Sequence, residues 1–195
     1  IIPIAADFHD PAGLDIAMER VGDFQGAIDG VVLSAGIDKT LPFGITTEKT
    51  ITEVLHLNTM VPLELIRRLL KAGRLKGSAS IILVSSVMGL VGQPGKAAYC
   101  ASKSALIGAA KVLALELAPQ RIRVNVVAPG VVETPLTENL FRKMTAENLL
   151  KLKEMHPLGF GKPDDVAELI LFLLSGNSSW ITGTTITIDG GYTAH

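Results

Sequence analysis

The sequence is poor in cysteine, carries almost no net charge, and has no apolar run long enough to cross a membrane. With a single cysteine, Cys100, the chain of 195 residues cannot form an internal disulfide, which is typical of a reducing compartment. The net charge of −1 argues against nucleic-acid binding. No leader with a basic start and an apolar centre is present. We therefore expect a cytoplasmic location, with neither nucleic acid nor membrane as a partner.

Metal-ligand spacing is also lacking. The four histidines are scattered along the chain at His9, His56, His156 and His195, so no metal site is expected. What the chain does have is apolar residues, which make up 48% of it and argue against a disordered protein. The length fits one domain with a sizeable core, spanning residues 1–195.

Apolar runs alternate with helical patterns along the whole chain. Strands are expected over residues 1–8, 28–36, 79–84, 121–130 and 184–191, and helices over 11–21, 50–75, 96–117 and 166–174. This alternation predicts an α/β fold with a doubly wound parallel sheet. In such sheets, ligands bind at the carboxyl ends of the strands.

Three side chains with useful chemistry are expected to converge at one such strand end. Ser86 follows the strand over 79–84, and Tyr99 and Lys103 stand four apart at the start of the next helix, on one face. A lysine ammonium and a helix N-terminus both favour a phenolate, so we expect the pKa of Tyr99 to lie below its usual value near 10. Tyr99 could then exchange a proton with an alcohol oxygen that Ser86 holds. The alternative is a chance pair on a solvated helix face.

With Asn58 upstream, this pattern resembles the short-chain dehydrogenases/reductases, and in its general features the 3-oxoacyl-[acyl-carrier-protein] reductases. The resemblance covers nearly all of the chain. It implies an oxidoreductase that transfers a hydride between NAD or NADP and a small-molecule carbonyl or secondary alcohol, with Tyr99 as general acid/base. It also implies a catalytic set of Asn58, Ser86, Tyr99 and Lys103, and a homodimer or homotetramer built on the helix that carries Tyr99 and on the long helix before it.

Pro62 interrupts the long helical pattern of residues 50–75. A proline has no N–H to donate to the carbonyl four residues back, here that of Asn58, so the helix should bend there. The resemblance implies that this freed carbonyl holds a water linking Lys103 to solvent. The alternative is a plain helix kink.

The resemblance also implies a set of cofactor-binding residues, namely Asp7, Phe8, Ser34, Ala35, Gly36, Tyr99, Lys103, Pro129, Gly130, Val132 and Thr134. Asp7 would bind the adenine, although it could equally cap the turn that follows it. The backbone near Val132 and the Thr134 hydroxyl would hold the nicotinamide carboxamide. Leu33-Ser34-Ala35-Gly36 stands where the family usually has Asn-Asn-Ala-Gly, so both asparagine side chains are replaced.

The family's glycine-rich turn, Thr-Gly-x-x-x-Gly-x-Gly, does not occur in this sequence. The resemblance begins at the third strand of the family's sheet, so the first two strands and their helices are absent. Because that turn binds the cofactor's pyrophosphate, we expect the 195 residues alone to bind cofactor weakly and to have doubtful activity.

Two alternatives remain: a truncated, non-catalytic relative acting as a binding or assembly module, and a Ser/Lys hydrolase, although no Gly-x-Ser-x-Gly frame surrounds Ser86. Residues 136–158 are expected to form an apolar lid over the substrate.

Overall fold

The computed structural model describes residues 2–10, 12–142 and 144–194. Four parallel strands form one sheet in the order β1-β2-β3-β4, which confirms the predicted α/β fold. The strands are β1 (Ile28–Leu33), β2 (Leu75–Val84), β3 (Arg123–Pro129) and β4 (Thr185–Ile188).

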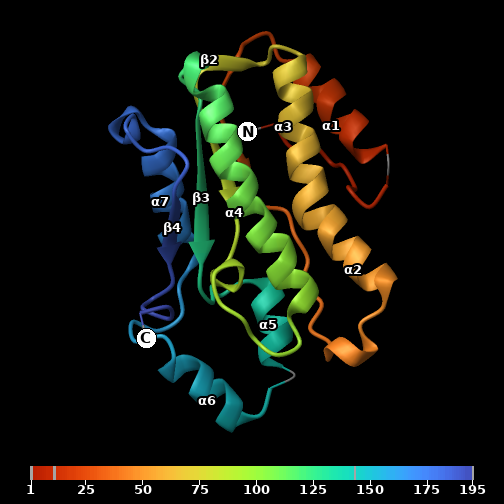
Figure 1. Cartoon of the computed structure of the whole chain (residues 1–195), viewed down its shortest axis with the longest axis vertical. Helices are drawn as coiled ribbons and strands as arrows, with labels where there is room; N and C mark the ends of the chain where they lie inside the picture. Colours follow the sequence, from red (N-terminus) through yellow and green to blue (C-terminus); the bar gives the residue numbers. More distant parts are fainter. Residues whose placement is uncertain (1, 11, 143, 195) are drawn as a thin grey trace.

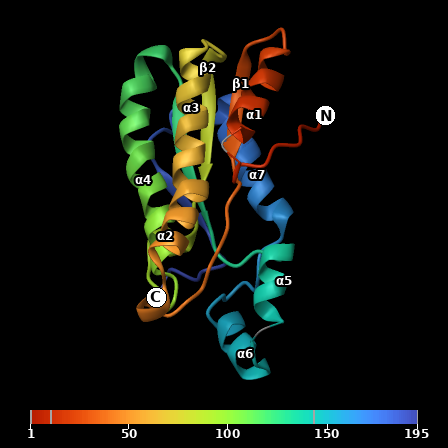
Figure 2. The same cartoon turned by 90° about the vertical axis from the view of Figure 1, so that its right-hand side faces the viewer.

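Helices cover both faces of the sheet, as the prediction of a doubly wound sheet requires (Figure 2). Successive side chains of a strand point to opposite faces, so Ile81 of β2 packs in one core cluster and Ile82 in the other. The first face is covered by α3 and α4, with α2 extending α3 at one end, and the second face by α7. These helices are α2 (Glu48–Leu55), α3 (Val61–Lys71), α4 (Ala97–Leu117) and α7 (Pro163–Leu174).

The carboxyl ends of the strands point toward the end of the molecule that carries α5 (Pro135–Phe141) and α6 (Ala146–Glu154) (Figure 1). These two short helices make up most of the segment predicted as a lid. The remaining helix, α1 (Gly13–Gly22), lies beside α3 at the β1 edge.

The prediction of a strand over residues 1–8 is wrong for the described part, because residues 2–7 have no strand structure. A strand needs a neighbour to complete its hydrogen bonds, and no described strand pairs with the free edge of β1. The segment instead runs beside α1. A Cβ on Gly13 would come within 2.1 Å of the Asp7 carbonyl oxygen, so glycine is required where this segment crosses the start of α1.

The helix predicted over residues 50–75 is interrupted where Pro62 predicts it. Between α2 and α3 lies a π-helical turn, His56–Met60, in which the Val61 N–H donates to the His56 carbonyl five residues back. Such turns widen the helix locally and are frequent at functional sites. Here the widened turn carries Asn58, which is completely buried.

Helix α4, with the 3-10 turn after it, is long and apolar enough over Ala97–Gln120 to cross a membrane by length and composition alone. This differs from the expectation that no apolar run reaches that length. Its composition has a structural reason, because Leu106, Ala110 and Ala114 pack in the core against β2 and β3.

Candidate active site

Tyr99 and Lys103 lie together in the first turns of α4, as their spacing predicts. The Lys103 Nζ atom is 5.7 Å from the centroid of the Tyr99 ring. Lys103 is only 4% exposed, and its Nζ donates a hydrogen bond of 2.9 Å to the Val84 carbonyl at the end of β2. This contact ties the start of α4 to the carboxyl edge of the sheet.

Ser85 and Ser86 follow β2 directly and have different partners. The Ser85 hydroxyl donates to the Lys103 carbonyl at 2.8 Å, so it holds the loop against α4. The Ser86 hydroxyl accepts the Met88 N–H at 3.2 Å and remains able to donate its own proton. A Cβ on Gly89 would lie 2.8 Å from the Ser85 hydroxyl oxygen, so a glycine is needed for this close packing.

The Asn58 side chain joins three parts of the site. Its Oδ1 accepts the Ile37 N–H at 2.8 Å, and its Nδ2 donates to the Ile37 carbonyl at 2.9 Å and to the Ser102 hydroxyl at 3.0 Å. A Cβ on Gly36 would lie 3.1 Å from Asn58 Oδ1 and 3.4 Å from Lys103 Nζ. Asn58 therefore belongs to the site through its side chain, which the sequence analysis did not foresee. The role of its carbonyl stays a prediction.

The ionisation of Tyr99 differs from the expectation. Burial and the negative charge of Asp38 raise the pKa of Tyr99 to about 12, and the nearby Ser86 hydroxyl opposes them only in part. Burial also lowers the pKa of Lys103 to about 8, which weakens the cation that was expected to favour the phenolate. The prediction of a lowered tyrosine pKa is therefore wrong for this structure, since loss of solvent and the charge of Asp38 raise the pKa more than the Ser86 hydroxyl lowers it.

A cleft of about 190 Å³ opens at the carboxyl ends of the strands and gathers most of the predicted residues. Those that line it are Ser34, Gly36, Ser86, Tyr99, Lys103, Pro129, Gly130, Val132 and Thr134. Asn58 stands behind this wall, held through Ile37 and next to Gly36. Ala35, Asp7 and Phe8 do not line the cleft.

The backbone after β3 leaves polar groups facing the cleft. Gly161 donates to the Val131 carbonyl at 3.0 Å and accepts the Glu133 N–H at 2.9 Å. Because the residues on either side make these bonds, the N–H and carbonyl of Val132 point the opposite way, and the carbonyl accepts the Thr137 hydroxyl at 2.7 Å. A Cβ on Gly130 would come within 2.9 Å of Asp189, so this backbone can follow its path only with glycine.

Comparison with known proteins identifies this arrangement. The family described as Enoyl-(Acyl carrier protein) reductase matches residues 1–193. The 3-oxoacyl-[acyl-carrier-protein] reductase FabG of Thermotoga maritima is 39% identical over 190 residues, which are 97% of this chain and 76% of that protein. The chain belongs to the short-chain dehydrogenase/reductase family.

Solved structures of the short-chain dehydrogenase/reductase fold agree closely with this chain. A short chain dehydrogenase family protein from Francisella tularensis has a TM-score of 0.90 at 35% identity, covering 98% of this chain and 81% of that one. The angucycline C-6 ketoreductase LanV with bound NADP also has a TM-score of 0.90, at 26% identity, covering 100% of this chain and 76% of that one. Membership of this family favours the oxidoreductase hypothesis over a non-catalytic module or a Ser/Lys hydrolase.

In this short-chain dehydrogenase/reductase, the Asp7 carboxylate caps the turn that follows it, which is the second of the two roles considered for it above. It accepts the His9 N–H at 2.9 Å and so caps its own turn, with Asp7 exposed and Phe8 partly buried. The adenine contact of these two residues stays a prediction.

The sequence analysis missed a second cavity of about 220 Å³ that shares Ser86 and Tyr99 with the cleft. Met144, Leu152 and His156 of the expected lid segment line this cavity, and their covering of a substrate stays a prediction. Lys96 and Asp38 also line it and were not foreseen. Their sequence signals were weak: Lys96 stands three residues before Tyr99, and Asp38 two residues after Gly36.

Proposed function

We propose that this short-chain dehydrogenase/reductase transfers a hydride between NAD or NADP and a small-molecule carbonyl or secondary alcohol, with Tyr99 as general acid/base. The observation that carries this proposal is the meeting of Tyr99, Ser86 and Lys103 in one cleft at the carboxyl ends of parallel strands. The likeness to a ketoreductase with bound NADP supports it.

In the direction of carbonyl reduction, Tyr99 donates its proton to the oxygen that becomes the alcohol. A pKa of about 12 keeps this phenol protonated at neutral pH, so the acid form is the resting form. The Ser86 hydroxyl donates a hydrogen bond to the same oxygen while negative charge develops on it. Lys103 stands one turn further along α4, where its ammonium supports the phenolate left after proton transfer.

The cleft residues fit a nicotinamide dinucleotide. Gly36 and Gly130 line the cleft, and the outward N–H of Val132 with the Thr134 hydroxyl offers partners for a carboxamide. When bound, the nicotinamide ring supplies or accepts the hydride. The chain's own residues orient it and hold the proton at Tyr99.

We also propose that the enzyme is cytoplasmic and assembles as a homodimer or homotetramer through α4. The outer face of α4 is apolar, with Val112 54% and Leu115 79% exposed. Ala101, Ala105 and Gly108 continue this stripe at helical spacing and are also exposed, so a second helix could approach closely. A second copy of the same face is the partner that matches it, since a two-fold axis pairs identical surfaces.

The decisive test is a ketone panel assayed with NADH and NADPH on a form of the protein that includes the family's glycine-rich turn, since the 195 residues alone are expected to bind cofactor weakly. Absorbance reports consumption of the reduced cofactor. We expect turnover by the wild type and loss of nearly all of it in Tyr99→Phe. No turnover of any ketone or alcohol by correctly folded wild type would contradict the proposed function.

A further inference from the structure

The second cavity has an ion pair in its wall. The ammonium of Lys96, which stands at the N-cap of α4, bonds to the carboxylate of Asp38 in the segment after β1. The two side chains are 7% and 18% exposed. They are the only charged groups among the described residues that line this cavity. Burying a charged pair destabilises the folded protein unless the remaining donors and acceptors of the two groups are also hydrogen-bonded.

Those hydrogen bonds are incomplete on both sides. A lysine ammonium has three N–H donors, and Lys96 finds one acceptor within the described chain, Asp38 Oδ2. The other carboxylate oxygen, Asp38 Oδ1, is buried without any partner in that part of the chain. Because Asp38 lines the cavity and rotation about the last torsion of an aspartate is soft, a turn of the side chain can bring this oxygen within reach of a ligand. The pair can therefore accept one hydrogen bond from a ligand and donate others to it.

This pair lies beside the reacting group. The Lys96 Nζ is 5.6 Å from the centroid of the Tyr99 ring, and Ser86 lines the same cavity. A substrate whose carbonyl oxygen reaches Tyr99 and Ser86 would have its neighbouring atoms close to Asp38 and Lys96. Much of the remaining wall is apolar, including Met88, Leu136 and Met144.

Charge balance decides which polar group fits. A substrate carboxylate would meet the negative charge of Asp38, and a substrate ammonium would meet Lys96, so neither ion finds an uncompensated partner. His156, from the lid side, has both ring nitrogens engaged: Nε2 accepts the Val131 N–H at 3.2 Å, and Nδ1 lies 2.8 Å from the Leu152 carbonyl. A neutral group with both a donor and an acceptor, such as a carboxamide, satisfies Asp38 and Lys96 at once.

We propose that Asp38 and Lys96 form a specificity-determining pair that binds a neutral carboxamide group on the substrate, near the carbonyl that reacts at Tyr99. This deepens the proposed function and rests on it. The pair would select short oxo-amides over apolar ketones and over oxo-acids of the same length.

Three matched probes test the proposal, namely 3-oxobutanamide, 3-oxobutanoate and 2-pentanone. For the wild type we expect kcat/KM for the amide to exceed that for each of the other two by about tenfold or more, the scale of hydrogen bonds to charged groups. Asp38→Asn leaves the Lys96 charge uncompensated, so it should move the preference from the amide to 3-oxobutanoate. The control is Asp29→Asn, which breaks a surface ion pair with Lys76 at the amino ends of β1 and β2 and should leave all three ratios unchanged.

A binding measurement separates this inference from the proposed function. Dissociation constants of the three probes are measured by ligand-observed NMR on wild type and Asp38→Asn, without turnover. Tenfold tighter binding of the amide, lost in the variant, supports the pair even if no probe is reduced, in which case the proposed function alone fails. If the variant changes all three probes by the same factor, or if the wild type binds them equally, the pair acts only on Tyr99 or on the fold and the proposal is overturned.

Discussion

The side chain of Asn58 donates a hydrogen bond of 3.0 Å to the hydroxyl of Ser102, and Ser102 donates in turn to the Tyr99 carbonyl at 2.7 Å. This short chain of hydrogen bonds joins the π-helical turn to the helix that carries the proposed acid. The same asparagine binds both backbone groups of Ile37. The buried side-chain amide of Asn58 thus sets the distance between α4 and the segment that follows β1.

Replacing Asn58 with Ala should therefore damage both stability and activity. It removes three hydrogen bonds and leaves the Ile37 N–H and carbonyl without their partner, at a cost of about 2–4 kcal/mol in the free energy of unfolding. Urea unfolding measures that loss. Ser102→Ala is the matched control, because it removes the hydroxyl link and leaves the Ile37 contacts, so it should cost no more than about half as much. Equal losses in the two variants would show that the two hydrogen bonds between Asn58 and Ile37 contribute nothing to the free energy of unfolding.

Tyr99→Phe should lower kcat for carbonyl reduction by about 10²- to 10⁴-fold, the usual contribution of a general acid. Cofactor affinity should change little, because the ring remains in place. Fluorescence titration with NADPH and NADH checks that affinity, and circular dichroism checks the fold. A variant that keeps more than about a tenth of the wild-type rate would show that Tyr99 is not the general acid.

Ser86→Ala should lower the rate on a similar scale, through the lost hydrogen bond to the substrate oxygen.

The sequence predicted the parts of this molecule that depend on local pattern. Strands β1 to β4 and helix α4 follow from apolar periodicity, and the interruption near Pro62 follows from the missing N–H of proline. The segment over residues 2–7 failed as a strand because pairing depends on a neighbour, which no local pattern reveals.

Within the site, spacing along one helix predicted the meeting of Tyr99 and Lys103. The pKa of Tyr99 was predicted in the wrong direction, because tertiary packing decides how deeply the ring is buried. Tertiary packing also brings Asp38, which is far away in the sequence, close to the ring. The pair of Asp38 and Lys96 was missed for the same reason, since 58 residues separate the two in the sequence.

The two shifted pKa values together contribute a maximum in stability near pH 10. Burial lowers the pKa of Lys103 from 10.5 to about 8, so above pH 8 the unfolded chain holds a proton that the folded protein has lost, and stability rises with pH. Burial raises the pKa of Tyr99 from 10.0 to about 12, so above pH 10 the folded protein holds a proton that the unfolded chain has lost, and stability falls.

Differences between variants isolate these two contributions from the other titrating groups. Lys103→Met should lack the rising limb, so the gain in unfolding free energy from pH 8 to pH 10 should be smaller than in the wild type by about 2–3 kcal/mol. Tyr99→Phe should keep that limb and lose the fall above pH 10. Urea titrations at half-unit pH steps measure both. Parallel curves for Lys103→Met and the wild type would mean that the buried lysine does not change its charge in this range.

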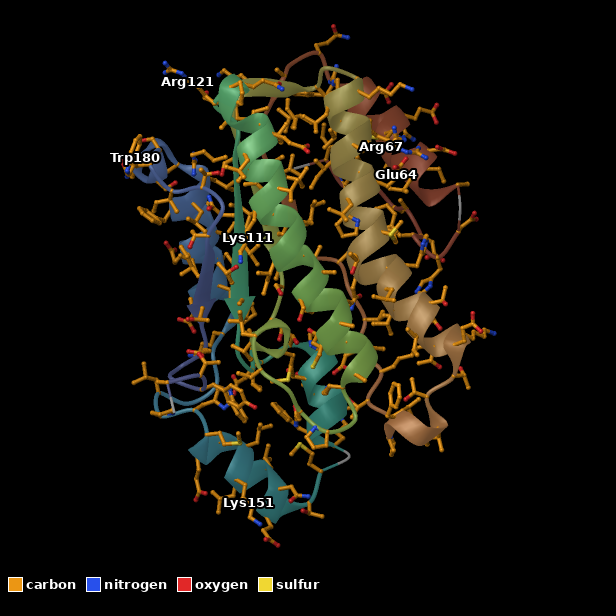
Figure 3. The ribbon with its side chains drawn as sticks, viewed as in Figure 1. Glu64, Arg67, Lys111, Arg121, Lys151 and Trp180 are labelled. Carbon is orange, nitrogen blue, oxygen red and sulfur yellow. The ribbon has the colours of Figure 1, made fainter. Side chains whose placement is uncertain are left out.

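The outer face of α4 gives the last prediction, which concerns assembly. Lys111, labelled on α4 in Figure 3, is exposed, and so are the apolar residues Val112 and Leu115. Leu115→Glu places a charge where two copies of α4 would meet, so sedimentation velocity should show a shift from the wild-type dimer or tetramer toward a smaller species at micromolar concentration. Leu150→Glu is the control, because Leu150 is 57% exposed on α6, away from α4, and should leave assembly unchanged. A wild type that sediments as a monomer would refute the interface, because the apolar stripe of α4 would then remain in contact with water.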